Sequence, residues 1–156
     1  MTDSFLLIKL VHVLSATLLF GTGLGTAFFM WRCYRSNDLA AIAVVTRDVV
    51  LADTMFTMPA IIIQPVSGYL MIEYMGYSLY TPWIIWSFGL YLFIGACWLP
   101  VVWLQVKMRD MAAVAVENNE VLPETFGVYF RIWTRLGYPA FICMLIIFAL
   151  MVFRPL

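Results

Sequence analysis

Residues 6–30 read LLIKLVHVLSATLLFGTGLGTAFFM. An α-helix needs about 20 residues to cross a hydrocarbon core of ~30 Å, and this apolar stretch is long enough. Its only ionisable side chains are Lys9 and His12, and His12 is the single histidine of the chain. The stretch therefore predicts a transmembrane helix that carries one imidazole inside the membrane.

The composition of the whole chain also indicates a membrane protein. Of its 156 residues, 64% are hydrophobic and only 12% are charged. A soluble domain of this length cannot hide so much apolar surface in a core, so the chain must meet lipid. The formal net charge is zero, which argues against a nucleic-acid partner. The first residues lack the basic region of a secretory signal peptide, so we expect the first helix to be retained.

Four segments are long and apolar enough to span a membrane, and short polar turns separate them. We expect helices at about 4–34, 39–75, 82–116 and 123–153, forming an all-α, integral-membrane four-helix bundle in a single domain over residues 1–156. Thr81-Pro82 and Pro123 mark helix starts, because proline's missing N–H costs nothing in the first turn.

Basic residues predict the orientation of this bundle. Of the nine lysine and arginine residues, only Lys9 and Arg154 lie at the end that holds both termini. Cytoplasmic loops carry the excess of positive charge in membrane proteins. We therefore expect both termini on the outer, periplasmic side, with His12 ~10 Å inside the membrane.

His12 is the strongest candidate functional residue. Ionisable groups inside a membrane are costly and usually functional. Imidazole and thioether sulfur form the usual axial pair of many haem sites, so His12 is a candidate iron ligand, with Met144 the first and Met71 the second candidate partner by depth. The remaining residues expected around this cofactor are Lys9 and Trp83 near its propionates, with Ser15 and Gln64 lining it.

Several alternatives to this ligand pair remain open. One is a neutral histidine that donates to a backbone carbonyl in a packed polar notch. Another is an iron with an open position or a second histidine from a partner subunit. Gly21 and Gly25 form a GxxxG pair on the opposite face of the helix, which favours close approach of a second helix and predicts a homodimer.

The second helix contains two prolines that disturb its hydrogen bonds. Pro59 and Pro65 free the carbonyl groups of Met55 and Ile61, respectively. A loosened helix with the amide of Gln64 nearby either lines a cofactor cleft or is a packing kink that Gln64 itself satisfies.

The same helix carries a buried acid and a methionine pair. Asp53 lies inside the membrane boundary, where a charge needs a partner, and we expect Arg131 or Arg135 to pair with it. Met55 and Met58 suggest an alternative function, a metal or small-solute permease domain.

Short motifs resemble a known family. Lys9-Leu10-Val11-His12, Gln64-Pro65-Val66-Ser67-Gly68 and Cys97-Trp98-Leu99-Pro100 resemble a bacterial domain-of-unknown-function family of small, predicted four-helix integral membrane proteins. That resemblance implies a multi-pass protein of the bacterial inner membrane. More distantly, the first helix is similar to HemJ-type porphyrinogen oxidases and CopD-type copper-resistance domains. The HemJ-type likeness implies haem b binding at His12. Those enzymes also use basic residues in later helices, whereas this chain has no lysine in the spanning part of its second, third or fourth helix.

Together these observations predict a haem b-binding membrane protein that acts in electron transfer or in a quinone- or porphyrin-linked oxidation. As an oxidoreductase it would need a quinone or another redox partner. The alternatives are the permease domain and a non-catalytic accessory subunit that docks through Gly21 and Gly25.

Overall fold

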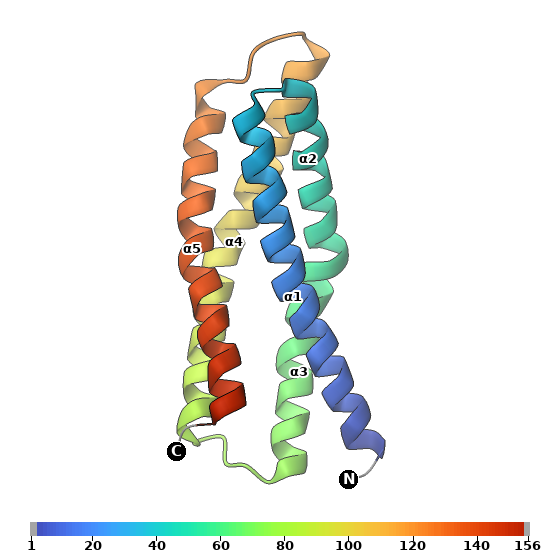
Figure 1. The fold of residues 1–156 in the computed structure, drawn as a ribbon, viewed down its shortest axis with the longest axis vertical. Helices are drawn as coiled ribbons and strands as arrows, with labels where there is room; N and C mark the ends of the chain where they lie inside the picture. The colour runs from blue at the N-terminus through green and yellow to red at the C-terminus, as the bar shows by residue number, and fades with distance from the viewer. Residues whose placement is uncertain (1–2, 155–156) are drawn as a thin grey trace.

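The computed structural model describes residues 3–154 and contains only helices and turns within them. The helices are α1 (Asp3–Ser36), α2 (Leu39–Ala52), η1 (Asp53–Thr57), α3 (Met58–Met75), α4 (Pro82–Glu117) and α5 (Glu124–Phe153). The segments α2, η1 and α3 follow one another without a break and form one span, Leu39–Met75. The described chain thus has four helices long and apolar enough to cross a membrane, which confirms the all-α membrane bundle (Figure 1).

The second span differs from the expected uninterrupted α-helix. At η1 the backbone forms one turn of π-helix, with the N–H of Met58 bonded to the carbonyl of Asp53. The turn lies immediately before Pro59, whose ring cannot donate a backbone hydrogen bond. Pro123 also departs slightly from expectation, because it is the N-cap of α5 and not its first helical residue.

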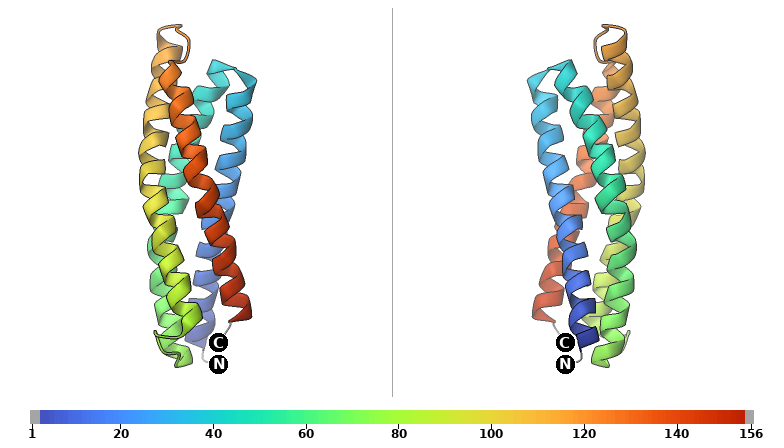
Figure 2. Two further views of the ribbon diagram at one scale, coloured as in Figure 1. Left: turned by 90° about the vertical axis from the view of Figure 1, so that its left-hand side faces the viewer. Right: turned by 90° about the vertical axis from the view of Figure 1, so that its right-hand side faces the viewer.

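The start of α1 and the end of α5 lie at the same end of the bundle, together with the connection between α3 and α4 (Figure 1). We call this end the terminal end. The other two connections lie at the opposite end, as both side views also show (Figure 2). The periplasmic placement of the terminal end stays a prediction that depends on the distribution of basic residues.

The two halves of the bundle pack differently. The main hydrophobic core lies in the half away from the terminal end and comes from α1, α2, α4 and α5, through Met30, Cys33, Ile42, Val49, Leu104, Met108, Ala112, Phe126, Phe130 and Trp133. In the terminal half, α3 packs against α1 and makes little direct contact with α4 or α5. The seam between α1 and α3 is therefore separate from the main core.

Large apolar side chains cover the outer surface of the bundle. Phe29, Ile62 and Leu99 are each more than 60% exposed, and many others resemble them on all four spans. Monomeric soluble proteins do not expose continuous apolar surface of this extent. Lipid is the solvent that this surface fits.

Candidate functional site at the α1–α3 seam

Four polar side chains meet where α1 crosses α3 in the terminal half. His12 and Ser15 come from α1, and Gln64 and Ser67 come from α3; all four are buried, at 3 to 9% exposure. Each pair is three residues apart, and residues at this spacing share one face of a helix. The sequence prediction that Ser15 and Gln64 lie beside His12 agrees with this arrangement.

Both ring nitrogens of His12 form hydrogen bonds to α3. Nδ1 lies 2.9 Å from the Ser67 Oγ, and Nε2 lies 3.1 Å from the Gln64 Nε2. The Ser67 hydroxyl lies 2.7 Å from the carbonyl of Ile63, and when it donates its single hydrogen there it can accept from Nδ1–H. The Gln64 Nε2 group can only donate, so the His12 Nε2 accepts. The contacts fit a neutral imidazole with its hydrogen on Nδ1.

Ser15 extends this network by one step. Its hydroxyl donates to the Gln64 Oε1, and the backbone carbonyl of His12 lies within reach as an alternative acceptor at 3.0 Å. The result is a connected chain in the order Ser67, His12, Gln64 and Ser15. The packed polar notch expected as an alternative thus uses a serine hydroxyl, and not a backbone carbonyl, as the partner of Nδ1.

Gly68 makes room for the imidazole. A Cβ atom at this position would lie 3.2 Å from His12 Cε1 and 3.7 Å from Nδ1. Carbon atoms at optimal separation are 3.5–4.0 Å apart, so a side chain here would push the ring. Sequence reasoning noticed Gly68 only as part of a motif, because the need for a glycine depends on which helix crosses it.

Tyr91 is a second residue that sequence reasoning missed. Its hydroxyl donates to the carbonyl of Ile61 at 2.5 Å. That carbonyl is the one expected to be freed by Pro65. Tyr91 of α4 therefore supplies the hydrogen bond that the Ile61 carbonyl loses through Pro65. The amide of Gln64 is not needed there and bonds to His12.

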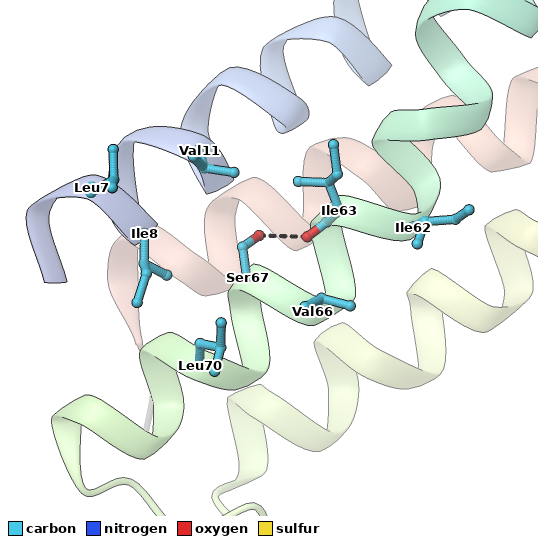
Figure 3. A pocket seen from close by; sticks show the side chains of 8 residues that line it. All are labelled: Leu7, Ile8, Val11, Ile62, Ile63, Val66, Ser67 and Leu70. Carbon is cyan, nitrogen blue, oxygen red and sulfur yellow. Dashed lines mark hydrogen bonds between the residues drawn. The ribbon is translucent and has the colours of Figure 1, made fainter. Parts of the chain in front are cut away.

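Two open grooves flank the seam on its outer side. The larger, of about 330 Å³, is lined by Leu7, Ile8, Val11, Ile62, Ile63, Val66, Ser67 and Leu70 (Figure 3). The smaller, of about 180 Å³, lies near Ser15 and Pro59 and shares Val11 and Ile63 with the first. Ser67 is the one polar residue that lines the larger groove, and its hydroxyl is bonded to the carbonyl of Ile63 (Figure 3). The lining of this groove is therefore mainly apolar. His12 lines neither groove.

The remaining candidate residues for a cofactor, Lys9 and Trp83, take no part in the hydrogen-bond network of His12 within residues 3–154. Lys9 is exposed on the surface of α1. Trp83 packs at the terminal end, where its ring is 5.7 Å from that of Tyr77 and 6.0 Å from the Arg154 guanidinium. The structure therefore joins Ser15 and Gln64 to His12 but places Trp83 in a separate aromatic cluster.

The candidate methionine partners are not opposite the imidazole. Helix α5 meets α1 at Phe20, whose ring lies 5.4 Å from Phe141 and 5.6 Å from Phe148. Met144 is therefore level with Phe20, and eight residues of helix, or ~12 Å, separate that level from His12. Met71 lies on α3 itself, one turn beyond Ser67. Within the described residues, the two ring nitrogens contact Ser67 and Gln64 and neither methionine.

The expected ion pair of Asp53 with Arg131 or Arg135 is wrong. Asp53 is buried at 7% exposure and accepts a hydrogen bond from the Thr57 hydroxyl at 2.7 Å. Both arginines are exposed, where their charges need no partner. Across residues 3–154 the ion pairs join only sequence neighbours, Arg47 with Asp48 and Arg109 with Asp110.

Gly21 and Gly25 remain open. A Cβ atom at either position would have no neighbour within 4 Å. This surface is available to a second helix, but the homodimer stays a prediction. Within the described residues, no three histidine, cysteine or acidic side chains come together as metal ligands.

Comparison with known proteins supports the membrane assignment. Residues 6–155 match the model of the family described as "Predicted integral membrane protein (DUF2269)". The comparisons with curated proteins and with solved structures returned no match. The more distant likeness to HemJ-type and CopD-type domains is not among the matches. Because the match covers nearly the whole chain, this multi-pass membrane protein belongs to the DUF2269 family of predicted integral membrane proteins.

Proposed function

We propose that the α1–α3 seam is a reversible proton-binding site, and that the protein serves a proton-linked process in the bacterial inner membrane, such as proton-coupled transport. The observation that supports this proposal is the four-member network around His12. Its hydrogen bonds can satisfy the imidazole with or without an added proton. A histidine buried in a membrane among uncharged partners is the kind of group that proton pathways use.

The neutral state is the one already described. His12 donates from Nδ1 to Ser67 and accepts at Nε2 from the Gln64 amide, and Ser15 donates to the Gln64 carbonyl oxygen. Each nitrogen and oxygen atom of these four side chains has at least one hydrogen-bond partner. Buried polar groups without partners are costly, so this completeness holds the two helices together.

Protonation requires only that the Gln64 amide rotate by half a turn. Its carbonyl oxygen then accepts from Nε2–H, and its NH₂ group donates to the Ser15 oxygen. Ser15 redirects its own hydrogen to the His12 backbone carbonyl, which already lies 3.0 Å away. The protonated ring keeps both its hydrogen bonds, and no helix has to move.

The surroundings make a bound proton easy to release. In the part of the chain that the structure describes, no acidic side chain forms a hydrogen bond or an ion pair with the ring. On α1 the nearest charge, Lys9, is exposed, and on α3 the titratable Tyr69 and Glu73 are exposed as well. Asp53 lies eleven residues from Gln64, or ~16 Å along the helix. With no fixed counter-charge, the cation gains only hydrogen bonds, which suits reversible binding.

The single histidine permits a direct test by ¹⁵N NMR of the full chain in lipid nanodiscs. We expect a neutral ring with hydrogen on Nδ1 at alkaline pH and a doubly protonated ring at acidic pH. Gln64→Leu should change the Nε2 signal, and Ser67→Ala should change the Nδ1 signal. Thr17→Ala is the matched control, because Thr17 is exposed and bonds only to its own helix.

A ring that stays neutral at every pH at which the bundle is folded would overturn the proposal. His12 would then be a fixed link between two helices. Protonation that is unaffected by Gln64→Leu would also contradict the mechanism, because the amide rotation would play no part in it.

Haem b ligation by His12 is the second candidate, and it is the function predicted from the sequence. It requires an imidazole inside the membrane, which α1 supplies. The arrangement described here does not fit an iron ligand, because the Gln64 amide occupies the Nε2 lone pair and the candidate methionines lie elsewhere. An absorption spectrum of purified protein after haem supplementation decides the question. Soret and α bands that disappear in His12→Ala would favour haem over the proton-binding site.

A further inference from the structure

A second buried polar cluster lies at the π-helical turn in the middle of the second span. It consists of Asp53 and Thr57 from η1 and Gln105 from α4, which are 7%, 6% and 3% exposed, respectively. Single π-helical turns inside α-helices are rare and often occur at functional sites. This cluster is the part of the molecule that the proposed function leaves unexplained.

Among residues 3–154, the Asp53 carboxyl has no basic partner. It accepts from the Thr57 hydroxyl, and the Gln105 amide lies against it. On α4 the nearest cations are engaged elsewhere, since Lys107 lies over the Trp103 ring and Arg109 pairs with Asp110. The facing part of α1 has no charged residue between His12 and Arg32, and the arginines of α5 are exposed. A carboxylate buried without a counter-charge is among the costliest groups in a protein interior.

Gln105 provides a second observation about the hydrogen bonding of this cluster. Its carbonyl oxygen Oε1 is buried and has no hydrogen-bond partner within the described residues. The oxygen and nitrogen of a side-chain amide can exchange places by rotation about one bond. After such a rotation, a carboxylic acid O–H at Asp53 can donate to the Gln105 oxygen, so the carboxyl group can be buried without a charge.

We infer that Asp53 is a proton-binding site that holds its carboxyl group in the neutral acid form, with Gln105 accepting from the acid O–H and Thr57 donating to the other oxygen. The ligand of the site is a proton. The inference does not depend on the proposed function of His12, because the two clusters share no residue.

The position of the site suggests how it would act with the first one. The buried stripe of η1 and α3 runs through Asp53, Thr57, Ala60, Gln64 and Ser67. Ala60 is its only apolar member. If the seam exchanges protons as proposed, this stripe connects a proton store in the middle of the membrane to the imidazole nearer the terminal end.

Infrared spectroscopy of the full chain in lipid nanodiscs tests the inference. A protonated carboxyl group has a carbonyl stretch at higher frequency than the bands of a carboxylate. We expect the wild-type protein at neutral pH to show this band and Asp53→Asn to lack it. Asp48→Asn is the matched control and should leave the band unchanged, because Asp48 is exposed and paired with Arg47.

Two further variants keep the test decisive if Asp53→Asn fails to fold. Gln105→Leu and Thr57→Val each remove one partner of the carboxyl group, and each should shift the band while the helical content is maintained. If neither variant shifted the band, the inference would be contradicted.

A difference spectrum with only carboxylate bands at neutral pH would overturn the inference. Loss of the band when choline chloride is replaced by sodium chloride would also overturn it, because the occupant would then be a metal cation. The ¹⁵N signal of His12 reports on the other site, so failure of one proposal is distinguishable from failure of the other.

Discussion

Replacing Gln64 with leucine tests whether the polar seam contributes to stability in the membrane. The substitution removes two hydrogen bonds, one from the Gln64 amide to the His12 Nε2 and one from Ser15 to the amide oxygen. Ser15 keeps an acceptor in the His12 carbonyl at 3.0 Å, so its hydroxyl stays paired. The His12 Nε2 has no substitute and becomes a buried, unpaired acceptor.

The expected loss follows from these contacts. A buried group left without its partner costs ~1–3 kcal/mol in soluble proteins. Hydrogen bonds between membrane helices are weaker when measured in double-mutant cycles, with an average of ~0.6 kcal/mol and a maximum of ~1.7 kcal/mol. We therefore expect Gln64→Leu to lower the free energy of unfolding by about 1 kcal/mol, or roughly fivefold in the equilibrium constant.

The assay is reversible unfolding in mixed micelles with increasing dodecyl sulfate, followed by circular dichroism. A double-mutant cycle with His12→Leu isolates the pairwise energy, for which we expect ~0.6–1.7 kcal/mol. Ile62→Leu is the control; its side chain is 64% exposed, so its effect should remain within ~0.5 kcal/mol. A coupling energy below ~0.3 kcal/mol would lie within ordinary additivity and would refute the hydrogen bond between the two residues.

Three other variants test further features of the structure. Gly68→Ala should destabilise the bundle by about 1 kcal/mol and shift the His12 NMR signals, because the new Cβ would lie 3.2 Å from the ring, whereas Gly89→Ala, with open space around it, should be neutral or stabilising. Unchanged His12 signals in the Gly68 variant would contradict the packing. Tyr91→Phe leaves the Ile61 carbonyl without its donor and should cost ~1–3 kcal/mol in the same unfolding assay; an unaffected midpoint would show that another donor takes its place. If the homodimer forms through Gly21 and Gly25, changing both to isoleucine should abolish cross-linking between subunits without unfolding the monomer, and a monomeric wild-type protein would reject the dimer.

The sequence by itself determined the membrane spans. Because the bilayer requires about 20 consecutive apolar residues per helix, the pattern is local and can be read along the chain. The start of α4 at Pro82 follows from local chemistry in the same way. The location of His12 inside the first span also follows from the sequence, as does the loss of the Ile61 hydrogen bond through Pro65.

Only the tertiary structure decided what these residues touch. The partners of His12 lie more than fifty residues away, and their contact depends on the crossing of α1 and α3. Tyr91 and Ile61 meet for the same reason, and Gly68 matters only because an imidazole lies against it. Matching residues by depth suggested Met144, but depth does not determine which helix is adjacent, and α5 contacts α1 nearer Phe20.

Asp53 shows most clearly that the sequence alone does not determine which residues come into contact. Charge alone suggested an arginine partner, because a buried carboxylate needs one. The fold instead leaves both arginines exposed and places a hydroxyl and an amide beside the carboxyl group at a π-helical turn. Local sequence determines where a helix lies in the membrane, whereas the rotation of each helix about its axis is set by packing against its neighbours. That rotation decides which buried polar groups meet.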